Sequence, residues 1–170
     1  YGAPLKLSYL PNITHNIQRC YDWFESARRK LEYQGHYQYL YCTKSSHFAF
    51  VLNEVLKNNV YLETSSSYDL DIVERLWQKG TINPNDLVLC NGIKNPDYLR
   101  KIKNLHDAGF SNIIPRIDSA RELEELAAVT VSQACLFRAR ARPGNGVRLT
   151  LRPPDKTGTD SHSAHFTLRP

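Results

Sequence analysis

Short apolar runs and segments of helical periodicity alternate along the chain, and this alternation restricts the possible folds more than any other feature. The apolar runs occupy residues 37–44, 60–62, 87–90, 112–116 and 131–138, and a helical pattern precedes the first run and separates the others. Alternating strands and helices are typical of a parallel sheet whose strands are joined by right-handed crossovers. The sequence therefore predicts an α/β fold, either a doubly wound sheet or a (β/α)8 TIM barrel.

Polar or charged residues close or directly follow these runs. Lys44, Glu63, Asn91, Arg116 and Arg138 all fall at predicted carboxyl ends of strands. In a barrel these ends converge on one site, so their polar character favours the barrel. The glycine patterns of dinucleotide-binding folds and of P-loops follow none of the strands, which counts against those nucleotide-binding folds.

Lys44 ends the most aromatic of the runs, Tyr37–Lys44, which lies between Gly35 and Ser45. An amine at the end of a buried strand can act as a nucleophile toward a carbonyl group. The alternative is a lysine that marks the strand end and extends its amine into water. From this stretch alone both interpretations remain open.

The longest helical pattern is predicted to begin after Thr14, whose hydroxyl suits an N-cap. Ile17, Phe24 and Leu31 recur at helical spacing and would form one apolar face toward the core. The basic residues 28–30 near its end suit the helix dipole and are expected to be solvated.

Two later helices carry capping signals at their starts. Asn95 precedes Pro96, which is the arrangement of an N-cap followed by proline at the first helical position. Ser119 stands three residues before Glu122, which is the spacing of a capping box. Between the third strand and its helix, Lys94 follows a turn.

The net charge of +5 is located at the carboxyl end of the chain. Residues 134–170 contain six Arg and one Lys against Asp155 and Asp160, so residues 1–133 are neutral overall. No tyrosine or tryptophan accompanies these arginines, and nucleic-acid binding is therefore not expected. We predict residues 1–139 to be the N-terminal part of a barrel and leave residues 140–170 as an unassigned basic, loop-like end.

Four cysteines are present, Cys20, Cys42, Cys90 and Cys135, without a C-x-x-C pair or histidines at zinc-ligand spacing. They are expected to be free thiols, and no metal site is expected. The sequence lacks an apolar run long enough to span a bilayer and a signal-peptide pattern at residue 1. A soluble, cytoplasmic protein without a membrane partner is therefore predicted.

Four stretches resemble the decarboxylases that use pyridoxal 5'-phosphate (PLP) and have an alanine-racemase-like barrel. They are Tyr1–Leu5, Tyr41–Lys44, Leu62–Ser66 and Cys90–Lys94. The last stretch, C-N-G-x-K, is similar to the arginine-specific branch, while diaminopimelate and ornithine decarboxylases are close relatives. The resemblance covers residues 1 to about 130 and implies a partial TIM barrel of this type.

The resemblance also implies roles for individual residues. Lys44 matches the lysine that binds PLP covalently, Glu63 an acidic residue beside the cofactor, and Arg138 an arginine that reaches the cofactor's phenolic oxygen. The implied reaction is decarboxylation of a basic amino acid, with L-arginine giving agmatine and carbon dioxide for polyamine synthesis. The alternative is an inactive homologue that acts as a binding or regulatory protein.

Several groups expected in the family have no counterpart here. In the family, the glycine loop for the phosphate, the carboxylate facing the pyridine nitrogen and a β-rich second domain lie downstream of the matched residues. We therefore expect a truncated chain or an aberrant carboxyl end, inactive alone, whose full-length form is a homo-oligomer.

Overall fold

Five parallel strands in sequential order form the centre of the structure, a computed structural model that describes residues 2–4, 7–129 and 138–139. The strands are β1 (Leu40–Cys42), β2 (Tyr61–Thr64), β3 (Val88–Cys90), β4 (Ile113–Ile117) and β5 (Arg138–Ala139). Each strand pairs in parallel with the next one along the chain. The strand order never reverses, as it would at the switch point of a doubly wound sheet.

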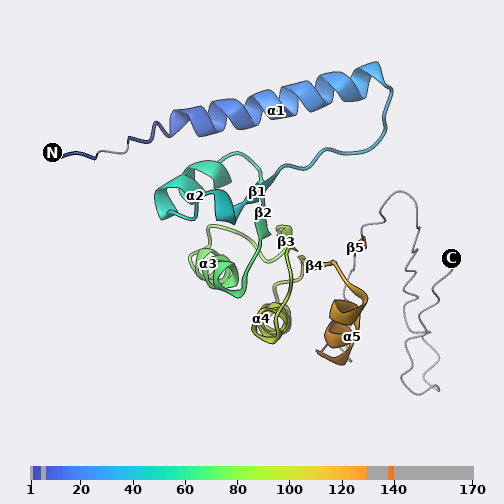
Figure 1. Cartoon of the computed structure of the whole chain (residues 1–170). Helices are drawn as coiled ribbons and strands as arrows, with labels where there is room; N and C mark the ends of the chain where they lie inside the picture. The colour runs from blue at the N-terminus through green and yellow to red at the C-terminus, as the bar shows by residue number, and fades with distance from the viewer. Residues whose placement is uncertain (1, 5–6, 130–137, 140–170) are drawn as a thin grey trace.

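The helices are α1 (Pro11–Lys30), the short 3-10 helix η1 (Thr43–Ser45), α2 (Ala49–Leu56), α3 (Ser67–Gln78), α4 (Pro96–Asp107) and α5 (Ala120–Val129). Helices α2 to α5 connect successive strands and lie on one side of the sheet (Figure 1), and α1 precedes the first strand. In Figure 1, α2 to α5 follow the outer side of the arc that the strands make. Sequential parallel strands with helices outside them are half of a (β/α)8 barrel, and the predicted fold class is confirmed.

The core lies between the sheet and its outer helices. In one register row, the side chains of Leu62, Val88 and Ile113 are buried in a cluster with residues of α2, α3 and α4. Burying such a side chain fully contributes about 1.5–3 kcal/mol. The next row points to the opposite face, away from these helices, and is only half-buried: Glu63, Leu89 and Ile114.

The starts of α3 and α4 are fixed by side-chain caps. Ser66 and Asp69 form a reciprocal capping box at α3. The side chain of Asn95 accepts a hydrogen bond from the backbone N–H of Tyr98 at 2.8 Å, and Pro96 occupies the first turn of α4. The predicted Asn95–Pro96 start of α4 is therefore confirmed.

Helix α1 begins earlier than predicted. Pro11, not a residue after Thr14, starts the helix, because proline at the first helical position already has the required φ and loses no hydrogen bond. Thr14 therefore lies within α1, and its hydroxyl donates to a carboxylate oxygen of Glu54 on α2 at 2.8 Å. The predicted cap at Thr14 is wrong, and the residue instead joins two helices.

Only the first half of the predicted apolar face of α1 is buried. Ile17 is 4% exposed and packs against Val55 of α2, whereas Phe24 and Leu31 are 52% and 78% exposed. Figure 1 shows α1 lying along α2 and then extending past it. Helix α2 has eight residues against 20 in α1 and is too short to cover the whole face.

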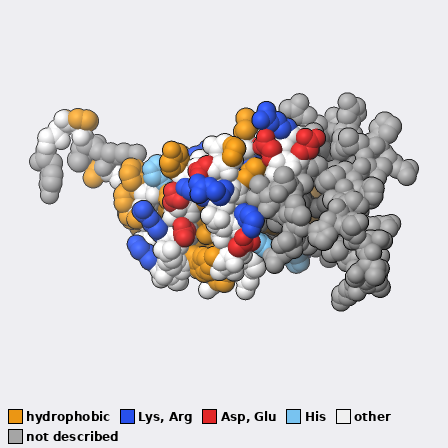
Figure 2. Space-filling view, turned by 90° about the horizontal axis from the view of Figure 1, so that it is seen from below, with side chains coloured by type: hydrophobic (Ala, Val, Ile, Leu, Met, Phe, Trp, Pro, Cys, Tyr) orange, Lys and Arg blue, Asp and Glu red, His pale blue; other side chains and the backbone are white. Residues whose placement is uncertain are grey.

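Opposite charges are interspersed over the part of the surface seen in Figure 2. On α3 and α4, Lys101 pairs with Asp71 at 2.6 Å, and Arg100 pairs with Asp97. No described helix is long and apolar enough to cross a membrane. The start of the predicted fifth strand, residues 131–137, and the carboxyl end, residues 140–170, lie outside the described residues.

Candidate active site at the carboxyl ends of the strands

Lys44 lies just beyond the carboxyl end of β1. The strand ends at Cys42, and Lys44 is in the short helix η1 rather than at the last strand position that the sequence predicted. Its neighbour Thr43 is buried and donates its hydroxyl hydrogen to the backbone oxygen of Glu63 at 3.1 Å. Lys44 itself is exposed, and none of the described residues hydrogen-bonds or ion-pairs with its amine. The turn is thus anchored to β2 while the amine remains accessible.

Glu63, Asn91 and Arg116 form a connected group across three neighbouring strand ends. The Asn91 side-chain amide donates to the Glu63 carboxylate, with 2.8 Å between Nδ2 and Oε1. Arg116 donates from Nη1 to Oδ1 of Asn91 at 3.4 Å. The structure therefore brings together three of the polar residues that the sequence placed at strand ends.

Lys44 and Glu63 lie at the same edge of the sheet. Cys42 is the register partner of Glu63, and Lys44 follows Cys42 by two positions in the chain. Among the described residues, no hydrogen bond or ion pair joins Lys44 to Glu63. An accessible amine and a hydrogen-bonded carboxylate thus come from the same edge of the sheet.

Arg138 continues the same row of strand ends. It is the first residue of β5 and the register partner of Arg116 on β4. The side chain of Arg138 lies outside the described part of the chain, so its predicted contact with a cofactor stays a prediction.

The sequence placed Lys94 after a turn and in the C-N-G-x-K stretch, but it did not indicate that the residue is buried. It is 2% exposed, and its amine donates to the backbone oxygens of Gly92, at 2.7 Å, and of Arg116. The Glu122 carboxylate of α5 lies 3.6 Å from this amine and also accepts the Lys94 backbone N–H at 2.8 Å. The predicted Ser119-x-x-Glu122 capping box is half confirmed: the Ser119 hydroxyl accepts the Glu122 backbone N–H at 3.2 Å, but the Glu122 carboxylate accepts the backbone N–H of Asp118 rather than that of Ser119. No sequence pattern marked Lys94 as its partner.

Neutral polar groups pack behind these strand ends. Thr64 and Tyr98 share a buried hydrogen bond with 2.7 Å between their hydroxyl oxygens. Burial raises the pKa of the Cys90 thiol to about 11, and burial also raises the pKa of Tyr98. Both groups are therefore uncharged at neutral pH. The charged side chains at these strand ends are Glu63, Arg116 and the Lys94–Glu122 pair.

The described residues contain neither a disulfide bond nor a cluster of side chains that could bind a metal ion. Cys20, Cys42 and Cys90 are free thiols, as predicted, while Cys135 lies outside the described part of the chain. No group of three or more His, Cys, Asp or Glu side chains in the described residues is arranged to hold a metal ion.

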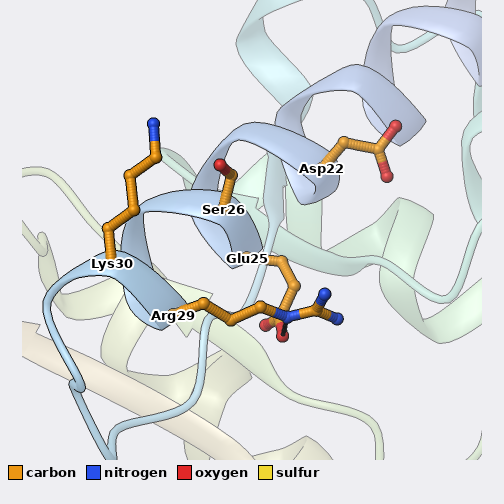
Figure 3. Close-up of a pocket in the computed structure, with 5 residues that line it drawn as sticks. All are labelled: Asp22, Glu25, Ser26, Arg29 and Lys30. Atoms are coloured by element: carbon orange, nitrogen blue, oxygen red, sulfur yellow. Dashed lines mark hydrogen bonds and ion pairs between the residues drawn. The ribbon is translucent and has the colours of Figure 1, made fainter.

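A shallow hollow on α1 is unrelated to the strand ends. It is lined by residues of this one helix, as Figure 3 shows: Asp22, Glu25, Ser26, Arg29 and Lys30. Hydrogen bonds from Arg28 and Arg29 lower the pKa of the Glu25 carboxyl to about 2. The hollow is therefore a gap between paired surface side chains and offers no converging reactive groups.

Comparisons with known proteins match arginine decarboxylases, while no protein-family model matches the chain. The arginine decarboxylase of Glycine max is 25% identical over 161 residues, which are 92% of this chain and 20% of that protein. The arginine decarboxylase of Solanum lycopersicum is 24% identical over 167 residues, 96% of this chain and 30% of that protein. The biosynthetic arginine decarboxylase of Shewanella denitrificans is 28% identical over 106 residues, 58% of this chain and 16% of that protein.

A solved structure shares the fold. The biosynthetic arginine decarboxylase of Campylobacter jejuni aligns with a TM-score of 0.65 and 22% identity, covering 82% of this chain and 23% of that one. The chain thus spans less than a third of the length of each of these relatives. The comparisons confirm the predicted resemblance: this chain is similar in sequence to arginine decarboxylases of plants and bacteria and has the partial barrel fold of one of them.

Proposed function

We propose that the polypeptide containing these residues decarboxylates a basic amino acid, with L-arginine as the first choice of substrate and agmatine and carbon dioxide as products. The observation that carries the proposal is the position of Lys44 and Glu63 at one edge of a parallel half-barrel. The similarity in sequence to arginine decarboxylases supports the choice of substrate. The polypeptide would act in the cytoplasm as a homo-oligomer and supply agmatine for polyamine synthesis.

The residues at this edge fit PLP as the cofactor. A covalent attachment needs an accessible primary amine, and the Lys44 amine is exposed and has no partner among the described residues. When bound, PLP supplies an electron sink for the electrons left behind by the departing carboxylate. Lys44 would hold the cofactor, Glu63 would present its negative charge to a cationic group, and Arg138 would contact the phenolic oxygen.

The proposal assigns activity to the whole polypeptide rather than to this chain alone. Residues 1–139 would be the N-terminal part of the PLP-binding barrel, and residues 140–170 have no assigned role. The groups expected to hold the phosphate and the ring nitrogen of PLP would come from the remaining length that relatives have beyond the matched part.

Replacing Lys44 with alanine in the full-length polypeptide tests the proposal. The unmodified protein, treated with PLP and borohydride, should carry the reduced cofactor on the peptide containing Lys44 and should release carbon dioxide from carboxyl-labelled arginine. Lys44→Ala should lose both signals and keep its circular dichroism spectrum, since the exposed side chain contributes little to the core.

Lys57→Ala is the matched control, because Lys57 is a surface lysine, its side chain 68% exposed, at the far end of α2. This variant should retain both the labelled peptide and the released carbon dioxide. A label on Lys44 without turnover of arginine, ornithine or diaminopimelate would favour the inactive homologue. A label on another lysine would contradict the assignment of Lys44.

A further inference from the structure

Asn91 uses both ends of its side-chain amide between two charged groups. Its Nδ2 lies 2.8 Å from Oε1 of Glu63, and its Oδ1 lies 3.4 Å from Nη1 of Arg116. A carboxylate accepts hydrogen bonds and a guanidinium only donates them. A flipped amide would place an oxygen against the carboxylate and an NH2 group against the guanidinium, so a single orientation satisfies both neighbours.

This arrangement occupies one oxygen of the Glu63 carboxylate and leaves the other available. Oε1 accepts from Asn91, whereas no described residue donates a hydrogen bond to Oε2. The side chain is half-buried and alternates with Leu62, which packs against the outer helices, so it belongs to the opposite face of the sheet. The hydrogen bond at Oε1 restrains the carboxylate, and Oε2 is left able to accept from a ligand.

The backbone beneath this group is fixed independently. The backbone N–H of Asn91 donates to the carbonyl of Thr64 at 2.8 Å, which continues the pairing of β2 with β3. The buried amine of Lys94 binds the carbonyls of Gly92 and Arg116 together. The ends of β3 and β4, which carry Asn91 and Arg116, are therefore held at a constant separation.

From these contacts we propose that Asn91 is a positioning residue, which orients the Glu63 carboxylate toward a cationic group of the bound ligand and is itself oriented by Arg116. The inference rests on the proposed function in one respect, namely that the ligand at this edge is PLP with its amino-acid substrate. Asn91 touches neither the reacting atoms nor the cofactor in this assignment. It acts through the direction and the charge of Glu63.

A double-mutant cycle in the full-length protein tests the role of Asn91. The PLP dissociation constant is measured for the unmodified protein, Asn91→Ala, Glu63→Gln and the double variant. Asn91→Ala should weaken PLP binding about tenfold when Glu63 is present, because loss of a positioning contact misdirects the charged group. In the Glu63→Gln background the same change should have an effect of less than about twofold, since interacting residues are not additive. Equal losses in both backgrounds would overturn the proposal.

Two further variants separate positioning from space filling. Asn91→Asp keeps the shape of the side chain but places a carboxylate beside that of Glu63, and it should bind PLP no better than Asn91→Ala. Full binding by Asn91→Asp would overturn the proposal. Asn112→Ala is the matched control, because this asparagine makes its side-chain hydrogen bond to the Asn85 backbone oxygen just before β4 begins, and it should bind PLP like the unmodified protein.

An observation on the cofactor-free protein distinguishes failure of this inference from failure of the proposed function. The side-chain amide resonances of Asn91 should shift in both Glu63→Gln and Arg116→Ala and remain unchanged in Asn112→Ala. If they do so while PLP fails to bind at Lys44, the positioning of Glu63 stands and the proposed cofactor falls. If they respond to neither change, Asn91 does not connect the two residues and the inference falls.

Discussion

Lys94 and Glu122 form a buried ion pair with 3.6 Å between Nζ and Oε2, and the pair joins three elements of the half-barrel. The Lys94 amine donates to the carbonyl of Gly92, just after β3, and to the carbonyl of Arg116 on β4. The carboxylate lies in the first turn of α5 and accepts the Lys94 backbone N–H. Water cannot take the place of either charged partner, because the Lys94 and Glu122 side chains are only 0% and 6% exposed.

Replacing Lys94 with methionine should lower the free energy of unfolding by about 3–5 kcal/mol, because the Glu122 carboxylate would remain buried without its cation. Urea denaturation followed by circular dichroism measures this loss. Replacing both residues with apolar side chains of similar volume should recover part of the stability, since no unpaired buried charge then remains.

Lys101→Met is the control for this prediction. Lys101 pairs with Asp71 at 2.6 Å, but the two side chains are 24% and 45% exposed. Loss of such a pair should cost less than about 1 kcal/mol, because water solvates the remaining charge. If the two single lysine variants lost the same stability, Lys94 would be solvated in solution and the buried pair would not form.

Gly92→Ala should be more destabilising than Gly80→Ala. Both glycines have left-handed backbone, with φ of +76° and +68°, and an alanine there costs about 1–2 kcal/mol. A Cβ on Gly92 would lie 3.1 Å from the backbone oxygen of Ser65, whereas a Cβ on Gly80 would meet no atom within 4 Å. Gly92→Ala should therefore lose roughly 1 kcal/mol more of its free energy of unfolding than Gly80→Ala does. Thermal unfolding of the two variants measures this difference. Equal melting temperatures would show that the β2 and β3 ends can separate freely.

The strand ends could be predicted because their signals are local. Apolar runs ending near Glu63, Asn91 or Arg116 locate a strand end to within about one residue without reference to any other part of the chain. The sequential order of the strands follows from the short connections and their common handedness. The fold class and the sharing of one edge by these residues were therefore predictable, although the hydrogen bond between Glu63 and Asn91 was not.

Two other features depend on contacts that periodicity does not encode. The apolar face of α1 is periodic through Leu31, but burial of its second half requires a neighbour longer than α2. Lys94 looks like a turn lysine until Glu122, 28 residues later, is placed beside it. Because both depend on the position of a distant element, sequence patterns alone gave the wrong environment for Leu31 and none for Lys94.

The two halves of α1 should respond differently to truncation of their apolar side chains. Ile17→Ala should cost about 2–4 kcal/mol, because it leaves a cavity beside Val55 and Val60. Leu31 is 78% exposed, so Leu31→Ala should change the free energy of unfolding by less than about 0.5 kcal/mol. Urea denaturation of both variants measures the difference. A large loss at Leu31 would mean that another part of the polypeptide covers this end of α1 in solution.

The stability of the protein should fall between about pH 9 and pH 11 through the buried thiol of Cys90. Burial raises its pKa from 9.0 to about 11, so the unfolded chain loses this proton at lower pH than the folded chain does. In that window the unfolded state binds fewer protons, and the free energy of unfolding declines by up to about 1.4 kcal/mol per pH unit.

Urea denaturation at pH 8 to 11 compares the unmodified protein with Cys90→Ala. The variant will be less stable at every pH, because the smaller side chain leaves a cavity, but it lacks the thiol and should lose less stability on going from pH 9 to 11. The pKa of Tyr98 is raised chiefly by burial and also by the neighbouring Cys90, so removing the thiol should reduce the Tyr98 contribution as well, in the same direction. Parallel curves over this range would mean that the Cys90 thiol ionises equally readily in the folded and unfolded states, and that water reaches it behind the end of β3.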